Sequence, residues 1–345
     1  MDVLKLAERE HHGLGAMMVS ADELVGEHDP NSARCPICRG VPRGIFAKDG
    51  YDILECAACG HRMAELGDWV RHVERTYDDS YFSAGGAGYS DYLSEGPLLR
   101  AAGRRYARLL RRHIPPGRIL DIGAAAGFVL KGFEDCGWQC TGIEPNATMA
   151  RYAKDILGLR TVTGAVEAVR LDETFDVVSM IQVIGHFRDP SEAMGRTAKL
   201  VRSGGYVLIE SWNRSSLTAR VLGRQWHEYS PPSVLHWFSV DGLCRLGLAA
   251  GLVRVAQGRP LKMLDGAHAK SLLKHKLPHG AAGAVASRLV ELIPERLPLI
   301  YPFDDLFWIL LRKPSGEFRE PTGSLAVNGG EKMQRRGGAR MRHVA

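Results

Sequence analysis

Between residues 118 and 211 the chain alternates strand-sized apolar runs with segments of helical periodicity. The apolar runs are RILDIGA, WQCTGIEP, LRTVTG, FDVVSMIQVI and GGYVLIES, with helical segments at 126–136, 146–157 and 190–202 among them. This rhythm is typical of a parallel sheet wound with helices on both faces. The sequence therefore predicts an α/β fold with a doubly wound, mostly parallel sheet. We expect LVRVAQG at 252–258 and LFWILLRK at 306–313 to complete it.

The first turn of this pattern, ILDIGAAAGF at 119–128, has the features of a cofactor-binding loop. Asp121 closes an apolar strand, and Gly123 and Gly127 flank a tight turn into a helix. Glycine lets the backbone approach a ligand without a side chain in the way. The G-x-G-x-x-G spacing that holds a pyrophosphate is absent, since Ala125 replaces the middle glycine and the third one is missing. The loop favours a nucleoside cofactor without a pyrophosphate, and NAD is the less favoured alternative.

A second anchor for a cofactor is Glu144, at the end of WQCTGIEP. A carboxylate about 20 residues past the first strand can accept hydrogen bonds from both hydroxyls of a ribose. That geometry serves NAD and S-adenosylmethionine equally, so Glu144 does not distinguish them. A surface glutamate at a strand end is the structural alternative.

Four blocks taken together, ILDIGAAAGF, TGIEPNATMARYA, FDVVSMIQVIGHFRDP and LVRSGGYVLIES, carry a specific resemblance. Over roughly 100–260 the chain resembles the class I S-adenosylmethionine-dependent methyltransferases. The resemblance implies a seven-stranded, mostly parallel sheet and S-adenosyl-L-methionine as cofactor. The implied cofactor-binding residues are Asp121, Gly123, Ala125 and Gly127 for the methionine and ribose, Glu144 for the ribose diol, Ala165 and Val166 for the adenine, and Gln182 near the sulfonium.

The chain departs from the family pattern at two positions. Ala125 stands where the family has the central glycine of its loop, and Gly185 stands before His186 where the family often has glutamate. A general base is needed only if the acceptor is a hydroxyl or a carbon acid. His186, directly after the fourth strand, is the first candidate for a catalytic residue, and a histidine without catalytic duty is the alternative. The other candidates for the base are His227, Tyr229 and His236.

Two CxxC pairs precede this region. Cys35, Cys38, Cys56 and Cys59 stand in CPICRG and CAACGH, each with a glycine just after the second cysteine. Two such knuckles present four thiolates to one tetrahedral Zn²⁺ in a closed, structural site. We therefore expect a small N-terminal zinc ribbon. Ribbons of this kind precede methyltransferase cores in enzymes that modify small metabolites and in some that modify ribosomal RNA, so the ribbon leaves the substrate open.

The predicted organisation has five segments. They are an N-terminal extension at 1–30, a zinc-ribbon-like module at 31–65, a linker or lid at 66–96, a methyltransferase domain at 97–313 with a helical insertion at 259–304, and a disordered tail at 314–345. We expect the aromatic-rich stretch 211–239 to reach the substrate site. Core packing is the alternative, and it is the preferred interpretation for Trp237 and Phe238. For the insertion at 259–304 we hypothesise a cover over the substrate pocket.

The net charge of +6 is local, because residues 100–118 hold seven arginines and no acid. A general affinity for nucleic acid is therefore not indicated. No apolar run approaches the length of about 18 residues that a membrane span needs. With no secretory signal evident at the N-terminus, a cytoplasmic location is expected.

The preferred function is methyl transfer to oxygen or carbon of a small-molecule metabolite, such as a sugar, a quinone-like or a polyketide-like compound. The first alternative is an RNA methyltransferase that uses the ribbon and the arginine-rich helix at 97–113. The second is a non-catalytic S-adenosylmethionine-binding or scaffold protein. The sequence leaves the oligomeric state open.

Overall fold

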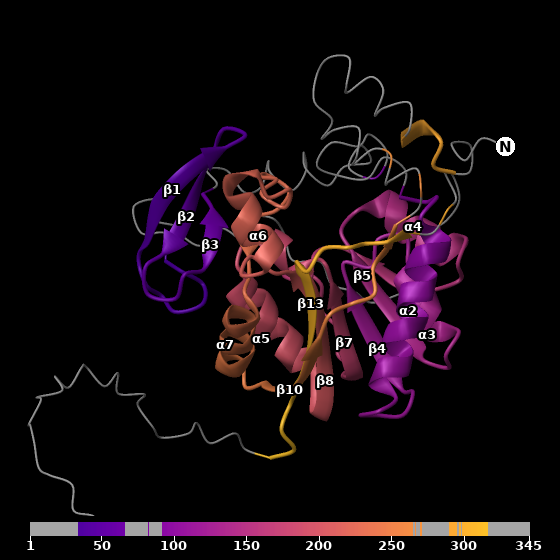
Figure 1. The fold of residues 1–345 in the computed structure, drawn as a ribbon. Helices are drawn as coiled ribbons and strands as arrows, with labels where there is room; N and C mark the ends of the chain where they lie inside the picture. The colour runs from indigo at the N-terminus through magenta and orange to yellow at the C-terminus, as the bar shows by residue number, and fades with distance from the viewer. Residues whose placement is uncertain are drawn as a thin grey trace, which may run out of the picture.

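The computed structural model describes residues 34–65, 82, 92–264, 266, 270, 290–294, 297 and 299–316. The predicted extension at 1–30 lies outside these residues, as do most of the predicted linker at 66–96 and nearly all of the tail at 314–345. In the described part, a central sheet is covered by helices on both faces, and a small second sheet lies at one side (Figure 1).

The central sheet has seven strands in the order β10-β13-β8-β7-β4-β5-β6. Strands β8, β7, β4, β5 and β6 pair in parallel, and β13 is antiparallel to both of its neighbours. The strands are β4 (Arg118–Ile122), β5 (Gln139–Glu144), β6 (Arg160–Thr163), β7 (Phe175–Ile181), β8 (Val201–Trp212), β10 (Val253–Gly258) and β13 (Leu306–Arg312). The prediction of a seven-stranded, mostly parallel sheet is confirmed.

Two layers of helices sandwich this sheet, as its buried, near-continuous apolar strands require. Helices α2 and α3 pack on one face, and α5 and α7 pack on the other (Figure 1). The helices of these layers are α2 (Gly96–Leu110), α3 (Phe128–Glu134), α4 (Ala147–Asp155), α5 (Pro190–Leu200) and α7 (Val240–Ala249). Polar side chains cap three of them, since Asn146, Asp189 and Ser239 each accept a hydrogen bond from a backbone amide of the first turn.

Helices α2 and α3 approach each other through two glycines. A Cβ on Gly103 would lie 2.0 Å from the carbonyl oxygen of Val129, and one on Gly132 would lie 2.2 Å from that of Arg100. No side chain fits at either position without moving a backbone. This contact fixes α2 against the sheet, and α2 forms one wall of the candidate active site.

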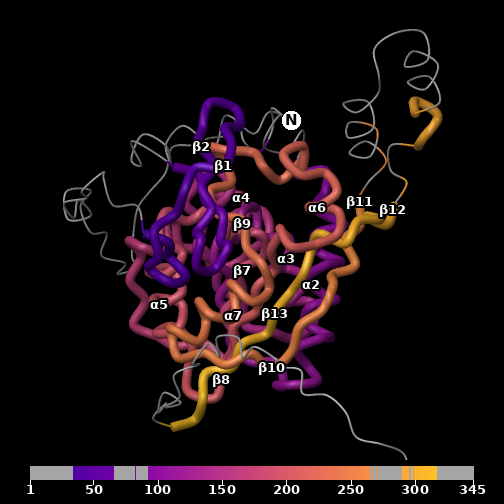
Figure 2. The backbone as a smooth tube through the Cα atoms, turned by 60° about the vertical axis from the view of Figure 1, so that its left-hand side comes forward, coloured from indigo at the N-terminus to yellow at the C-terminus, as the bar shows by residue number. Residues whose placement is uncertain are grey.

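The N-terminal cysteines belong to a second, antiparallel sheet in the order β1-β2-β3-β9. Its strands are β1 (Pro42–Lys48), β2 (Tyr51–Cys56), β3 (Arg62–Ala64) and β9 (His236–Trp237). Because β9 comes from the methyltransferase segment, the small sheet runs across the boundary between the two predicted domains. Strand β3 pairs with β9, and Figure 2 shows β1 and β2 in front of the core.

The remaining elements are short. They are η4 (Ile184–His186), α6 (Leu217–Leu222), η5 (Gly223–Gln225), β11 (Met263–Leu264) and β12 (Leu299–Ile300). Strands β11 and β12 pair with each other at the two ends of the insertion at 259–304, which the sequence did not indicate. Most of the predicted helical part of this insertion lies outside the described residues.

Substitution of Gly103 tests the α2–α3 contact. Gly103→Ala should lower the free energy of unfolding by about 1–3 kcal/mol, because the added methyl group overpacks two helices that touch through their backbones. Gly195→Ala, in α5, is the matched control, since a Cβ there meets nothing within 4 Å. That variant should be up to about 1 kcal/mol more stable, as alanine is the better helix former. Urea unfolding monitored by circular dichroism measures both, and equal effects would contradict the packing argument.

Candidate active site and cysteine cluster

The carboxyl ends of the parallel strands bring the predicted cofactor residues together. Strand β4 pairs in parallel with β5 on one side and β7 on the other, so their carboxyl ends meet at one edge of the sheet. Crevices at this edge are the usual ligand sites of such sheets. A pocket here, the cofactor pocket, is lined by Gly123, Ala125, Glu144, Ala165, Val166, Gln182 and His186 among other residues. Phe82 and Tyr92, from the predicted lid, also line it.

The loop after β4 is held open toward this pocket by its backbone. The amides of Gly123 and Ala124 donate to the carbonyl of Ile143 at 2.8 and 3.0 Å. Ala125 has a φ of 47°, in the left-handed region where glycine is favoured. Alanine therefore accepts a conformation that suits the family's glycine, at a cost of about 1–3 kcal/mol.

Glu144 occupies the floor of the pocket and ties the loop to β5. Its carboxylate accepts hydrogen bonds from the backbone amides of Ala125 at 2.7 Å and Asn146 at 2.8 Å. The side chain is nearly buried, and this burial raises the pKa of Glu144 to about 7 in spite of the two hydrogen bonds. Each carboxylate oxygen has a second lone pair, so Glu144 retains capacity to accept bonds from ribose hydroxyls.

Asp121 and Gly127 lie near the pocket without being among its lining residues. Asp121 is buried in β4, where the Ser179 hydroxyl donates to its carboxylate at 2.6 Å, and burial raises its pKa to about 7. Gly127 has a φ of 81° and begins α3, and a Cβ there would lie 2.7 Å from a methyl of Leu159. The structure thus gives both residues a part in shaping the loop. Their roles toward a cofactor stay predictions.

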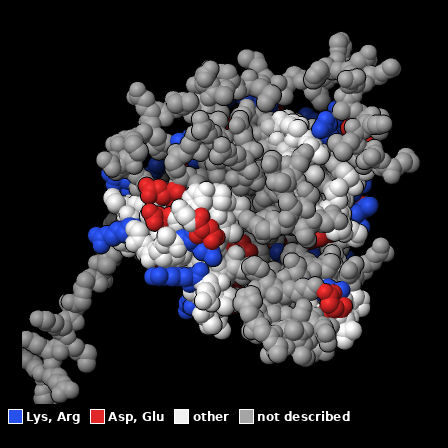
Figure 3. Space-filling model, turned by 90° about the horizontal axis from the view of Figure 1, so that it is seen from above, with Lys and Arg blue, Asp and Glu red and all other residues white. Residues whose placement is uncertain are grey.

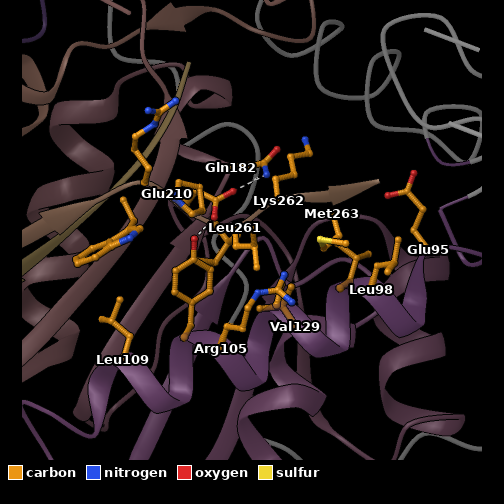
Figure 4. A pocket seen from close by; sticks show the side chains of 17 residues that line it. Glu95, Leu98, Arg105, Leu109, Val129, Gln182, Glu210, Leu261, Lys262 and Met263 are labelled. Atoms are coloured by element: carbon orange, nitrogen blue, oxygen red, sulfur yellow. Dashed lines mark hydrogen bonds between the residues drawn. The ribbon is translucent and has the colours of Figure 1, made fainter. Parts of the chain in front are cut away.

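A second cavity, which we call the acceptor cavity, adjoins the cofactor pocket. Ile181 and Gln182 line both. Its floor comes from α2, its back from β8 and β13, and its roof from residues 259–263 (Figure 4). The other residues that line it are Glu95, Leu98, Leu99, Ala102, Arg105, Tyr106, Leu109, Val129, Glu210, Arg259, Pro260, Leu261, Lys262, Met263 and Trp308.

Glu210 provides a carboxylate to the wall of this cavity near the junction. It is 5% exposed, and it pairs with Ile181 on β7 and Trp308 on β13. The amide of Gln182 donates to its Oε1 at 2.5 Å, and the hydroxyl of Tyr106 donates to its Oε2. Burial raises the pKa of Glu210 to about 7, partly offset by the positive charges of Lys262 and Arg105.

His186, the first candidate for a base, lines the cofactor pocket and not the acceptor cavity. Its Nδ1 lies 2.6 Å from the carbonyl oxygen of Ser233, so this nitrogen carries the proton and donates. Burial lowers the pKa of His186. Gly185, the departure from the family pattern beside it, has a physical reason, because a Cβ there would lie 2.9 Å from the carbonyl oxygen of His236. The role of His186 stays a prediction.

Two of the other candidates for a base face the cysteine module. The Nδ1 of His236 lies 3.1 Å from the Nε2 of His61, and burial lowers the pKa of His236 to about 4. The hydroxyl of Tyr229 accepts a hydrogen bond from Arg62 at 2.5 Å. His227 lies apart from both, with its Nε2 3.1 Å from the hydroxyl of Tyr301.

The aromatic stretch 211–239 is used mainly for packing. Trp226, Tyr229 and Trp237 form a buried cluster with Ile53 of β2. Phe238 is buried in the main core. For Trp226 and Tyr229 this packing differs from the expectation that the stretch reaches the substrate site. For Trp237 and Phe238 it agrees with the preferred interpretation of these two residues as core packing.

The four cysteines of the two CxxC pairs form one cluster. The Sγ atoms of Cys35, Cys38, Cys56 and Cys59 all lie within 4.8 Å of one another. Two of the Sγ separations are 3.4 Å (Cys35 to Cys59) and 3.5 Å (Cys38 to Cys56). Sulfurs on a tetrahedral zinc lie about 3.8 Å apart, given Zn–S bonds of about 2.3 Å. The donor set therefore fits a four-thiolate metal site.

The two knuckles use their glycines differently. Gly60 in the second knuckle has a φ of 69°, whereas in the first knuckle it is Arg39 that takes the left-handed conformation, with a φ of 60°. Gly40 is needed for space, because a Cβ there would lie 3.1 Å from the Sγ of Cys56. Gly60 therefore permits the tight turn of its knuckle, while Gly40 leaves room for the sulfurs.

The sequence interpretation missed the polar residues of the acceptor cavity. Arg105 and Tyr106 lie in the arginine-rich helix predicted at 97–113, and nothing in that pattern marks a cavity beside them. For Glu210 a signal existed: it is the one acidic residue in the apolar run GGYVLIES, near the carboxyl end of a buried strand. Lys262 could not be found, since it lies about 50 residues further along the chain in irregular backbone.

Comparison with known proteins finds a methyltransferase domain in this chain. Residues 93–257 match the family model described as a methyltransferase domain. The chain is 33% identical over 116 residues to a ubiquinone biosynthesis O-methyltransferase of Rhodopseudomonas palustris, covering 32% of this chain and 46% of the relative. It is 30% identical over 149 residues to the protein of the same name from Aeromonas salmonicida, covering 39% of this chain and 63% of the relative. The chain thus spans about half to two thirds of the length of these relatives.

Solved structures are similar as well. One is a methyltransferase of Thermotoga maritima described as a possible histamine N-methyltransferase, with 20% identity, a TM-score of 0.43, and coverage of 64% of this chain and 92% of that one. Another is magnesium protoporphyrin IX methyltransferase of Synechocystis, with 12% identity, a TM-score of 0.44, and coverage of 68% and 97%.

Residues 93–257 thus match a methyltransferase domain, and the strand order is the one that the resemblance to class I S-adenosylmethionine-dependent methyltransferases implies. None of the helices in the described part of the chain combines the length and apolar character that a membrane crossing needs.

Proposed function

We propose that this protein transfers a methyl group from S-adenosylmethionine to oxygen or carbon of a small-molecule metabolite. The observation that carries the proposal is the junction at Ile181 and Gln182, where the cofactor pocket opens beside the acceptor cavity. A donor and an acceptor bound on either side of this junction would be held next to each other. The relatives named for ubiquinone biosynthesis support a quinone-like ring over a sugar or a polyketide-like compound.

The residues of the cofactor pocket fit the proposed donor. Glu144 offers carboxylate oxygens to the ribose hydroxyls, and Ile143 and Val166 offer an apolar slot for the adenine. A Cβ on Gly123 would lie 2.5 Å from a methyl group of Val183, so only glycine fits at this edge of the pocket without moving Val183. Gln182, at the junction, lines both the cofactor pocket and the acceptor cavity.

Bound S-adenosylmethionine supplies a methyl group on a positively charged sulfur, so the chemistry needs little activation of the donor. The protein's main contribution is then orientation of the two reactants, which can supply much of the rate. Tyr92 and Phe82 add apolar surface to the wall of the cofactor pocket.

The RNA alternative loses support from the arginine-rich helix. Arg100 and Arg104 both pair with Asp135, and Arg105 lines the acceptor cavity. On the described part of the face drawn in Figure 3, basic side chains are interspersed with acidic ones. A phosphate backbone is best held by a continuous basic stripe. We therefore favour the small molecule.

For the cysteine cluster we propose one structural Zn²⁺ held by Cys35, Cys38, Cys56 and Cys59. Two of these side chains are fully buried, and four thiolates leave no coordination position open for a substrate. The metal would hold the two knuckles together. Strand β3, which pairs with β9, would then fix the position of β9 and of the loop around His186. The ribbon therefore acts on the active site through packing.

Exchange of Glu144 tests the cofactor site. Ribose hydroxyls donate to the carboxylate form, so binding of S-adenosylhomocysteine should tighten as pH rises through about 7, the raised pKa of this residue. Glu144→Gln should weaken binding about tenfold or more at pH 8 and flatten the pH dependence. Calorimetry between pH 5.5 and 8.5 measures both, with Glu134→Gln on α3 as the control. Unchanged affinity in Glu144→Gln would refute this assignment.

Elemental analysis tests the zinc proposal. Protein purified under reducing, chelator-free conditions should contain one zinc per chain, and Cys56→Ser should lose metal and stability because metal binding there is folding energy. Cys244→Ser, on α7, changes a cysteine outside the cluster and should keep both. Wild-type protein without zinc, or equal metal content in the two variants, would contradict the proposal.

A further inference from the structure

The acceptor cavity contains one buried carboxylate that the cofactor does not require. Glu210 lies on β8, shares the sheet face of Tyr206 and Leu208, and so points toward α2. Figure 4 shows Leu98, Arg105 and Leu109 of α2 facing Glu210, Gln182 and Lys262 across the cavity. A carboxylate in such a place is costly to bury, because it is removed from water and forms no ion pair with the residues that the structure describes.

The hydrogen bonds to Glu210 hold its carboxylate in one orientation. Gln182 and Tyr106 donate to different oxygens, so neither oxygen can turn away without losing a bond. Gln182 is itself fixed by a backbone hydrogen bond to the carbonyl of Glu210 at 2.9 Å and by a left-handed φ of 59°. The carboxylate is therefore positioned at the junction where the methyl group would pass.

The cavity also has an uneven charge. Its titratable or charged side chains besides Glu210 are Glu95, Arg105, Tyr106, Arg259 and Lys262. Three cations thus face two carboxylates, while the remaining walls are mostly apolar. Lys262 is held over the ring of Trp212, with its Nζ 4.6 Å from the ring centroid. Such a cavity favours an apolar ligand that carries negative charge.

We propose that Glu210 is the general base of this site, and that the cavity takes a ring-sized, apolar acceptor with an acidic hydroxyl and a separate anionic group. The inference rests on the proposed methyltransferase function. The hydroxyl proton passes to the Glu210 carboxylate as the hydroxyl oxygen forms its bond to the methyl carbon. The methyl–sulfur bond breaks, its electron pair stays on sulfur, and Glu210 later releases the proton to water.

The acidity of Glu210 suits this role. Its pKa of about 7 leaves the carboxylate ionised at a working pH of 7 to 8 while keeping it more basic than an ordinary glutamate. A phenol, with a pKa of about 10, is within reach of such a base, whereas an ordinary alcohol is far less acidic. Arg105 and Lys262 would stabilise the negative charge that develops on the acceptor oxygen.

The test begins with binding and then turns to turnover. Calorimetry with S-adenosylhomocysteine is done first, followed by methylation assays with phenol, 4-hydroxybenzoate, 3-hydroxybenzoate and methyl α-glucoside as probes. We expect the hydroxybenzoates to be methylated in preference to phenol, and the glucoside to be inert. At saturating cofactor, kcat should rise with pH through about 7, since the base must be ionised.

Glu210→Gln should lower kcat at least about 100-fold and abolish the rise with pH, with affinity for S-adenosylhomocysteine within about twofold of wild type. The control Glu228→Gln makes the same change at a largely buried carboxyl outside the cavity, and should keep kcat within about threefold.

Folding is checked separately. The pKa of Glu210 in the folded protein lies above its ordinary value of 4.5, so ionisation of this carboxyl lowers the stability of the fold at pH 8. The unfolding temperature of Glu210→Gln at pH 8 should therefore be no lower than that of wild type.

Two further variants separate positioning from packing. Tyr106→Phe removes a donor to the carboxylate and should move the rise in kcat to higher pH. Lys262→Gln should raise KM for the hydroxybenzoates about tenfold and leave that for phenol nearly unchanged.

Turnover of Glu210→Gln within threefold of wild type would overturn the role of the base. Preference for the glucoside, or no binding and no methylation of any phenol, would overturn the acceptor class. If wild type fails to bind S-adenosylhomocysteine, before any acceptor is added, the proposed function itself fails.

Discussion

The parallel pairing of β4 with β5 and β7 is the constraint on which the rest of the site depends. It places the loop after β4, the carboxylate at the end of β5 and the turn after β7 at one edge of the sheet. Glu144 then joins the first two by accepting from the amide of Ala125. Gln182 joins the third to β8 by donating to Glu210. The cofactor pocket and the acceptor cavity thus lie next to each other at the same strand ends. Helix α2 borders the acceptor cavity, and its glycine contact with α3 holds it there.

The cysteine module is connected to this edge from outside. Strand β3 pairs with β9, His61 contacts His236, and the carbonyl of Gly185 accepts from the amide of Leu235. The glutamate that the family resemblance leads us to expect at position 185 would not fit beneath this segment, because a Cβ there would lie 2.9 Å from the carbonyl oxygen of His236. One sequence departure therefore has a structural cause: the backbone that attaches the ribbon occupies the space of the missing side chain.

The fold and the cofactor pocket could be predicted because their signals are local. Apolar runs of strand length mark the sheet, and Gly123 and Glu144 follow strands whose ends must meet. The acceptor cavity could not be predicted in the same way, because Arg105, Glu210 and Lys262 come from three distant segments and only packing brings them together. Part of the aromatic stretch 211–239 misled for the opposite reason. Trp226 and Tyr229 are residue types that often line a pocket, but here they pack against Ile53 of the small sheet.

The methyl donor and the acceptor are proposed to meet at Ile181 and Gln182. A crystal structure with S-adenosylhomocysteine bound tests this proposal most directly. We predict the ribose over Glu144, the adenine beside Val166, and the sulfur at the junction, facing the cavity that contains Glu210. A ligand bound elsewhere, or a sulfur directed away from this cavity, would contradict the account.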